Sequence, residues 1–234
     1  MEPFLALPRS LRWAVGIFAA IAFAGVLYYF VHPSPNDGYD FQAFYCGAKV
    51  LAAHANPYLD KPLHACEAQA APRIAYTLGH ITVPSPLPPY ALAIFIPLSM
   101  LPYVWAKTIW LLVLLASVVL CAWAAAKLSR LPFVLAAAGC ALAIGAPALP
   151  LGALAPVPIA LIFLAAFFVS RDNWNAAAVC AALAMVEPNV ALPVNIALFC
   201  FVPAMRMRLS AAALALAAIA VGVAGLPTTI FYFT

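Results

Sequence analysis

Charged residues are scarce in this chain of 234 residues. Asp, Glu, Lys and Arg together make up 8% of it, whereas hydrophobic residues make up 68%. A typical soluble domain is about 25% charged and about 45–50% apolar. A soluble core of this length would present too few polar groups to water to stay dissolved. The composition therefore excludes a soluble globular enzyme and a disordered chain, and it indicates an integral membrane protein.

The few charges also exclude a nucleic-acid-binding surface. Eleven Lys and Arg residues oppose seven Asp and Glu residues, which gives a net charge of +4. A nucleic-acid surface needs a dense basic patch, and this small surplus fits the flanks of membrane spans better. The sequence lacks a P-loop, a CxxC pair and a GxSxG motif. We expect no enzyme cofactor, and no His pair has a spacing that demands a metal.

Runs without charge mark the predicted membrane spans. A charge at the bilayer centre costs roughly 3 kcal/mol on insertion scales, and a crossing helix needs about 20 mostly apolar residues. The sequence predicts an all-α, polytopic transmembrane helical bundle forming a single domain over residues 1–234. Segments shorter than a full span are expected to be tilted, re-entrant or paired across a break. The hydrophobic segments, subdivided by Gly and Pro, are 13–31, 88–101, 103–126, 132–149, 155–169, 174–186, 189–204 and 209–226.

Basic residues orient these spans. The apolar stretch of the first segment is too long for a cleavable signal peptide, so we interpret it as a signal-anchor. The positive-inside rule places the basic clusters in the cytoplasm and the loop 32–87 outside. Segment 103–126 then crosses once while 88–101 dips in without crossing; a conventional crossing by 88–101 is the alternative. The basic clusters are Arg9 and Arg12, Lys127 and Arg130, Arg171, and Arg206 and Arg208.

The predicted outer loop holds most of the polar residues. Four of the seven acids and all four His residues lie in it or at its edge. Apolar side chains from Phe41 onward recur at i, i+3 and i+4 spacing, which predicts an amphipathic helix near 41–53 with one face on the membrane surface. Asn56-Pro57 ends this helix.

Asp40 directly precedes the predicted helix and has two interpretations. Its carboxylate can cap the free N–H groups of the helix. It can also act as a general base at the membrane surface and activate an acceptor hydroxyl. The residue types alone favour the cap, and the two roles are compatible.

Glu187 is the only acid embedded in the apolar second half of the chain. An intramembrane carboxylate indicates a functional site. The alternative is a residue at the end of a segment that reaches interfacial water, which Pro188 and Asn189 support. The predicted topology places the break at 186–188 on the outer side, together with the break at 150–152.

Other polar residues of the loop offer further candidates. Cys46 and Cys66 both lie in the loop, where an oxidising compartment favours a disulfide. Arg73 can pair with a phosphate, and His80 can contact one, although an ordinary surface residue is the more common case for each. The remaining Cys residues lie in apolar segments and are interpreted as small buried residues.

Several short motifs, in order, resemble glycosyltransferase family 87 of the GT-C superfamily. The order and spacing of the motifs carry the resemblance, and they cover most of the chain. They are Asp40-Phe41, Tyr45, Asn56-Pro57-Tyr58, Pro88-Pro89, Pro97-Leu98, Leu101-Pro102, Trp110, Gly152 and the stretch from Arg171 to Pro188.

The resemblance implies a membrane hexosyltransferase with a GT-C-like fold in the bacterial inner membrane. Such enzymes transfer a sugar, commonly mannose, from a polyprenyl-phosphate donor to an acceptor on the outer side of the bilayer. Asp40 matches the expected catalytic acid, and inversion at the sugar is expected. The candidate substrate-binding residues are Tyr45, Tyr58, Arg73, His80 and Glu187. The donor, an unknown acceptor and the lipid bilayer are the expected partners, and nucleic acid is not one.

Two alternatives remain open. This chain has Ala153 where the family often has Gln, Glu187 where it often has Lys, and Leu87 where a Tyr usually precedes the paired prolines. These differences favour an inactive relative that binds a lipid-linked sugar or a partner subunit. A transporter that uses Glu187 as a coupling site is the second alternative, although the sequence shows no inverted repeat.

Overall fold

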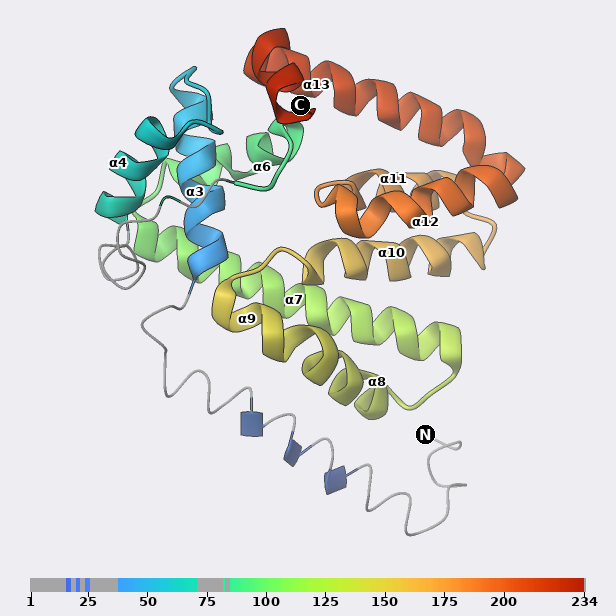
Figure 1. Ribbon diagram of the computed structural model, residues 1–234. Helices are drawn as coiled ribbons and strands as arrows, with labels where there is room; N and C mark the ends of the chain where they lie inside the picture. The colour runs from blue at the N-terminus through green and yellow to red at the C-terminus, as the bar shows by residue number, and fades with distance from the viewer. Residues whose placement is uncertain are drawn as a thin grey trace.

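The computed structural model describes residues 16, 17, 20, 21, 24, 25, 38–70, 82 and 85–233. This part of the chain is all-α, as the sequence predicts (Figure 1). Most of the predicted first span at 13–31 lies outside the described residues.

The helices follow the predicted hydrophobic segments closely from residue 89 onward. The stretch predicted as one segment at 132–149 contains two α-helices joined by a π-helical turn. The helices are α3 (Tyr39–Ala52), α4 (Asp60–Ala70), α6 (Pro89–Ser99), α7 (Tyr103–Ser129), α8 (Phe133–Cys140), the π-helical turn Ala141–Gly145, α9 (Ala146–Leu151), α10 (Pro156–Val169), α11 (Trp174–Ala184), α12 (Pro188–Phe201), the 3₁₀ turn Pro203–Met205 and α13 (Arg206–Phe233).

In the described part of the chain, three helical stretches are long and apolar enough to cross a membrane. They are Tyr103–Ser129, Phe133–Leu151 and Pro203–Phe233. The apolar helices α6, α10, α11 and α12 are shorter, with 11 to 14 residues each. A helix of 14 residues is about 21 Å long, which is less than the roughly 30 Å of the hydrocarbon core.

Prolines mark the starts of several helices. Pro89, Pro156 and Pro188 each begin a helix, where the missing N–H costs no hydrogen bond.

The longest apolar helix, α13, is kinked at Gly225 and continues through Pro227 to Phe233. The kink turns the last part of α13 toward α6 (Figure 1), and Tyr232 Oη donates a hydrogen bond to Pro86 O at 3.1 Å.

Helix α3 is the predicted amphipathic helix, but its environment differs from the prediction. Its side chains from Phe41 to Ala48 are all buried, including Gln42 and Cys46. The helix packs against α4, α6, α7 and α9 instead of lying with one face on a membrane surface. Small residues make this enclosure possible, because Leu92 and Ser85 approach to within 3.1 and 3.2 Å of the position that a Cβ would take at Gly47.

A disulfide and a hydrogen bond join α3 to α4. Cys46 and Cys66 form the disulfide that the sequence favours. Beside it, Gln42 Nε2 donates to Glu67 O at 2.8 Å. Helix α4 itself was not among the predicted helices, because its polar sequence gives no hydrophobic segment.

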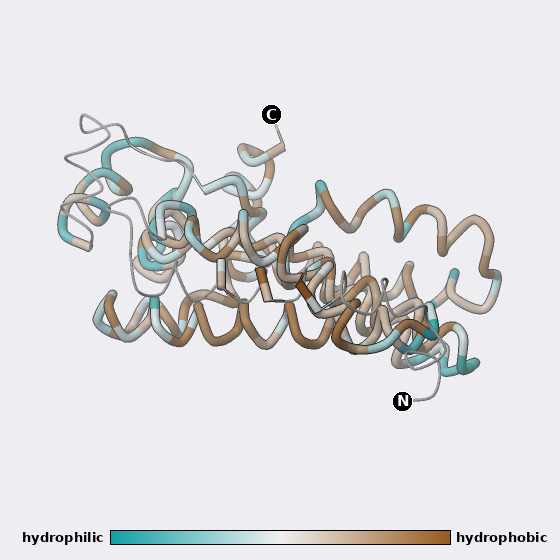
Figure 2. Tube along the Cα trace, turned by 90° about the horizontal axis from the view of Figure 1, so that it is seen from below, coloured by the Kyte–Doolittle hydropathy of each residue, from teal (hydrophilic) through white to brown (hydrophobic). Residues whose placement is uncertain are grey.

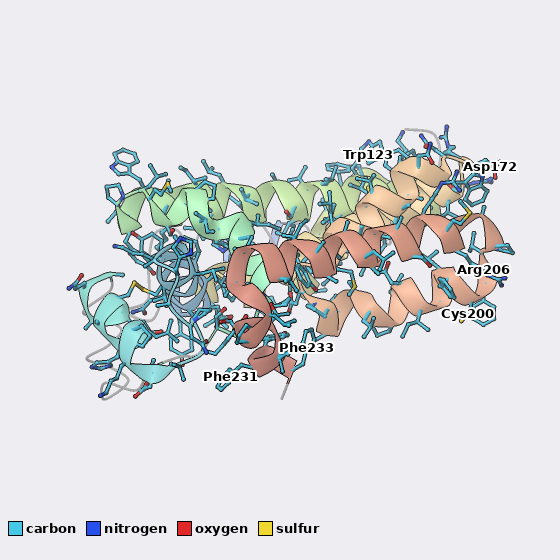
Figure 3. All side chains as sticks on the ribbon, turned by 90° about the horizontal axis from the view of Figure 1, so that it is seen from above. Trp123, Asp172, Cys200, Arg206, Phe231 and Phe233 are labelled. Carbon is cyan, nitrogen blue, oxygen red and sulfur yellow. A yellow bond between two sulfur atoms is a disulfide. The ribbon has the colours of Figure 1, made fainter. Side chains whose placement is uncertain are left out.

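Basic residues gather at the end of the bundle opposite to α3 and α4. Figure 2 shows hydrophilic residues at the two ends and hydrophobic ones between them, and Figure 3 shows Asp172 and Arg206 at one end. Arg208 Nε donates to Asn175 Oδ1 at 2.7 Å, which joins the starts of α13 and α11. Trp123 packs edge-on against Phe167, which joins the ends of α7 and α10. Lys127, Arg130, Arg171, Arg206 and Arg208 therefore share this end.

Candidate functional site

The start of α3 is fixed to the end of α9. Gly38 N donates to Pro150 O at 2.8 Å, and Tyr103 Oη donates to Gly38 O at 3.3 Å. Gly38 adopts the left-handed conformation, with φ +84°, and takes the N-cap position itself. Asp40 consequently lies inside the first turn of the helix and not at its N-cap. The cap interpretation of Asp40 is therefore wrong, which leaves its carboxylate available for another role.

The break after α9 fits closely against α3. Gly152 has φ +68°, and a Cβ there would lie 2.9 Å from the Cβ of Phe41. Trp110 Nε1 donates to Gly152 O at 2.7 Å, and its ring stacks on Phe41 with centroids 5.9 Å apart. A side chain at position 152 would force the two segments apart. The glycine therefore lets residues 153–155 lie next to the first turn of α3.

A cavity of about 220 Å³ lies at this junction. It is lined by the first turns of α3, the segment before α6, the break after α9 and the start of α12. Cavities for drug-sized ligands measure roughly 300–1,000 Å³, so this one suits a ligand of about one sugar ring. The lining residues are Asp40, Ala43, Phe44, Pro86, Leu87, Ala153, Leu154, Ala155, Glu187, Pro188 and Asn189.

Two carboxylates from distant parts of the sequence meet in this cavity. Burial raises the pKa of Asp40 above its ordinary value. Burial also raises the pKa of Glu187, and the negative charge of Asp40 raises it further. Among the described residues that line the cavity, none is Lys, Arg or His. The site is consequently acidic, and protons bind to it more readily than to exposed carboxylates.

One oxygen of Glu187 lacks a partner. Among the buried side-chain oxygens and nitrogens of the described residues, Glu187 Oε2 alone makes no hydrogen bond. The side chain as a whole is only partly buried, so the interpretation in which Glu187 reaches interfacial water stays a prediction. Leaving a buried acceptor unpaired costs about 1–3 kcal/mol, so the arrangement points to a ligand that completes it.

The loop that carries Glu187 is held in place from both sides. Tyr90 Oη donates to Met185 O at 2.9 Å, which ties the loop to α6. Val186 is buried in the same apolar cluster as Phe41 and Leu154. Pro188 begins α12 directly after Glu187. These contacts fix the backbone on both sides of the carboxylate.

The other predicted site residues lie elsewhere. Tyr45 Oη donates to Leu101 O at 2.8 Å, and Tyr58 Oη donates to Leu87 O at 2.8 Å. Neither tyrosine is among the residues that line the cavity, and both hydroxyls fix the ends of nearby segments. Arg73 and His80 lie outside the described residues. In the described part of the chain, His, Cys, Asp and Glu residues form no group of three that could hold a metal ion.

Several residues that line the cavity were not predicted from the sequence. Asn189 is two residues after Glu187 in the sequence, and Leu154 is two residues after Gly152. Both therefore lie next to residues that the sequence already identifies as candidates. Pro86 belongs to the proline-rich segment before α6, and only its packing against α3 reveals its place. The signal for Asn189 and Leu154 was adjacency to a helix break, since interrupted helices at membrane depth line cavities.

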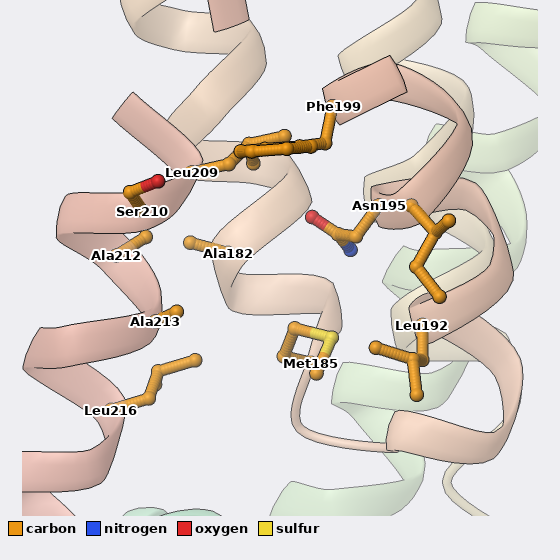
Figure 4. Close-up of a pocket in the computed structure, with 11 residues that line it drawn as sticks. Ala182, Met185, Leu192, Asn195, Phe199, Leu209, Ser210, Ala212, Ala213 and Leu216 are labelled. Carbon is orange, nitrogen blue, oxygen red and sulfur yellow. The ribbon is translucent and has the colours of Figure 1, made fainter. Parts of the chain in front are cut away.

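A second cavity of about 270 Å³ lies between α11, α12 and α13 (Figure 4). Its walls are almost entirely apolar, with Asn195 and Ser210 as the polar side chains that line it. Asn195 Nδ2 already donates to Ala181 O and Ala191 O. This cavity offers no acid or base, so the acidic cavity is the candidate functional site.

Comparison of the chain with protein-family models, with curated proteins and with solved structures found no match.

Proposed function

We propose that this protein is a membrane glycosyltransferase that transfers a hexose from a polyprenyl-phosphate sugar to an acceptor hydroxyl. The observation that carries the proposal is the half-buried carboxylate of Asp40, which lines a cavity of about 220 Å³ next to two helix breaks. The sequence resemblance supplies the donor class and favours mannose as the sugar. The family also expects its catalytic acid at the position of Asp40.

The proposed chemistry uses Asp40 as the base. Its carboxylate accepts the proton of the acceptor hydroxyl as the hydroxyl oxygen attacks the anomeric carbon of the donor sugar. The bond between that carbon and the phosphate oxygen breaks, and its electron pair leaves with polyprenyl phosphate. The new glycosidic bond has inverted configuration, and protonated Asp40 then releases its proton to water. The raised pKa of Asp40 supports this role, because a base works best with a pKa near the working pH.

The two ends of the bundle support an outward-facing site. The basic residues Lys127, Arg130 and Arg206 gather at the end opposite to the cavity, and the positive-inside rule assigns such an end to the cytoplasm. The disulfide between Cys46 and Cys66 fits an oxidising compartment on the other side. We therefore assign the protein to the bacterial inner membrane with its cavity on the extracytoplasmic side.

Sugar transfer from radiolabelled polyprenyl-phosphate hexoses, in membranes that contain the protein, tests the proposal. Asp40→Asn is expected to lower transfer by about 10²–10⁴-fold, because it removes the base and keeps the shape. Asp60→Asn, at the start of α4, is the matched control and is expected to keep wild-type activity. Formation of the Cys46–Cys66 disulfide reports that each variant is folded. Full transfer by Asp40→Asn, or no transfer by the wild type from any donor, would contradict the proposal.

A second candidate is a non-catalytic protein that binds a lipid-linked sugar or a partner. Glu187 favours it, because this acid stands where the family often has Lys, and the described lining of the cavity offers no cation to stabilise a leaving phosphate. This candidate predicts that the wild type binds the polyprenyl-phosphate sugar without turning it over. It also predicts that Asp40→Asn leaves this binding unchanged.

A further inference from the structure

We infer that the cavity between Asp40 and Glu187 is the subsite for the acceptor sugar, and that Glu187 positions this sugar by binding a second hydroxyl group. The inference rests on the proposed glycosyl transfer and names the part of the reaction that the cavity serves. Asp40 would take the proton of the reacting hydroxyl, while Glu187 would be a positioning residue that does not touch the reacting atoms.

The charge of the cavity excludes the phosphate of the donor from it. Both ionisable residues that line it are acids, and the described lining contains no Lys, Arg or His to compensate a phosphate. Asp40 is negatively charged when it acts as the base, and it repels a phosphate strongly where water is sparse. An uncharged sugar meets no such repulsion, so the neutral substrate is the one that the cavity fits.

The unpaired oxygen of Glu187 identifies the kind of group that completes the site. Glu187 Oε2 is buried without a hydrogen-bond partner among the described residues. An ionised carboxylate only accepts hydrogen bonds, whereas a protonated one also donates. A sugar hydroxyl both donates and accepts, so it satisfies Glu187 in either protonation state.

The walls of the cavity suit a single sugar ring. Ala43, Phe44, Leu87 and Leu154 give apolar sides, and the two carboxylates stand among them. Binding sites commonly combine apolar walls with a few polar groups that fix the orientation of the ligand. At about 220 Å³ the cavity has room for a monosaccharide unit, while a lipid tail must lie outside it.

The two carboxylates are held on separate, fixed supports. Asp40 depends on the hydrogen bond from Gly38 N to Pro150 O, and Glu187 on the hydrogen bond from Tyr90 Oη to Met185 O. A sugar that bridges them is held at two hydroxyls. Holding a reactant in this way places its nucleophilic oxygen against the base before the reaction begins.

Steady-state kinetics of Glu187→Gln tests the inference, with methyl α-mannoside and methyl α-glucoside as acceptor probes. At a pH where Glu187 is ionised, we expect the KM for the acceptor to rise roughly 10-fold, because a hydrogen bond to a charged carboxylate becomes one to a neutral amide. The KM for the polyprenyl-phosphate donor should stay unchanged, and kcat should change by less than threefold. Asp172→Asn, at the basic end of the bundle, is the control and should alter neither constant; Asn tolerates the left-handed backbone of that position.

The outcomes separate this inference from the proposed function. An unchanged acceptor KM in Glu187→Gln, or a raised donor KM instead, would overturn the inference while transfer itself stands. Absence of transfer by the wild type would overturn the proposed function. In that case, binding of radiolabelled methyl α-mannoside and mannose 1-phosphate to the purified protein still tests the cavity. The inference requires the uncharged sugar to bind more tightly and to lose affinity in Glu187→Gln; preference for the phosphate overturns it.

Discussion

The hydrogen bond from Gly38 N to Pro150 O joins the first turn of α3 to the end of α9 at 2.8 Å. Both residues lie next to helix ends, and Tyr103 Oη donates to the carbonyl of the same Gly38. Asp40 follows two residues later, so this junction sets where its carboxylate lies. The close fit of Gly152 against Phe41 belongs to the same junction.

Gly152→Ala is expected to destabilise the protein and to disturb the cavity. A methyl group would lie 2.9 Å from the Cβ of Phe41, and the residue would keep a left-handed backbone that costs Ala about 1–2 kcal/mol. Thermal unfolding in detergent should show a total loss of roughly 2–4 kcal/mol. Gly139→Ala in α8 is the control, because nothing lies within 4 Å of its Cβ position; it should be neutral or slightly stabilising. Equal stability of the two variants would refute this account of the junction.

The rate of sugar transfer is expected to depend on the charge state of Asp40. The base works when it is deprotonated, so transfer should fall as the pH drops through the pKa of Asp40. Burial raises that pKa above the ordinary 3.8, so the loss should begin at a higher pH than for an exposed Asp. Neighbouring titratable groups are Glu187 and Tyr39, whose pKa values are raised partly by the charge of Asp40.

The pH profile of kcat/KM for sugar transfer is the measurement. Comparing this profile between the wild type and Glu187→Gln also checks the coupling between Asp40 and Glu187. Interaction between charges is mutual, so removing the charge of Glu187 should shift the acid limb to lower pH. If kcat/KM falls at the same pH in the variant as in the wild type, the two carboxylates do not interact. Thermal unfolding at each pH separates this effect from loss of the folded protein.

Thiol labelling is expected to place the two ends of the bundle on opposite sides of the membrane. Cys200 is exposed at the end of α12, and Arg206 Nη2 donates to its carbonyl. In a variant whose other cysteines are Ser, a membrane-impermeant maleimide should label Cys200 in inverted vesicles and not in intact cells. A variant that keeps only Cys66 should show the opposite pattern. Labelling of both sites from the same side would overturn the proposed orientation.

Hydropathy predicted most of the helices, because helices depend on local sequence, and the shared position of Cys46 and Cys66 in the predicted outer loop predicted their disulfide. Segment 103–126 became α7, and the helix predicted near 41–53 became α3, shifted by one or two residues. Helix α4 escaped prediction since it is polar, and its disulfide and its packing on α3 fix it. Burial of α3 from Phe41 to Ala48 depends on neighbours such as Leu92, which no pattern in α3 itself reveals.

The candidate site was predictable only in pieces. Asp40 and Glu187 were each identified as candidates because acids are scarce in this sequence. The predicted topology placed both segments on the outer side of the membrane. Their meeting in one cavity depends on how α3, α9 and α12 pack, which charge-free runs do not encode. The cap interpretation of Asp40 failed because the left-handed Gly38 starts the helix two residues earlier than the acid.

The bend of α13 at Gly225 couples a distant helix to the shape of the cavity. It brings Tyr232 to Pro86, whose carbonyl accepts the tyrosine hydroxyl, and the Tyr232 and Phe231 rings also pack on Tyr58. None of the described residues that line the cavity belongs to α13, yet the last turns of this helix support the wall that Pro86 and Leu87 form. Straightening the helix would remove the hydrogen bond from Tyr232 to Pro86 and the ring contacts with Tyr58, so the wall would lose this support.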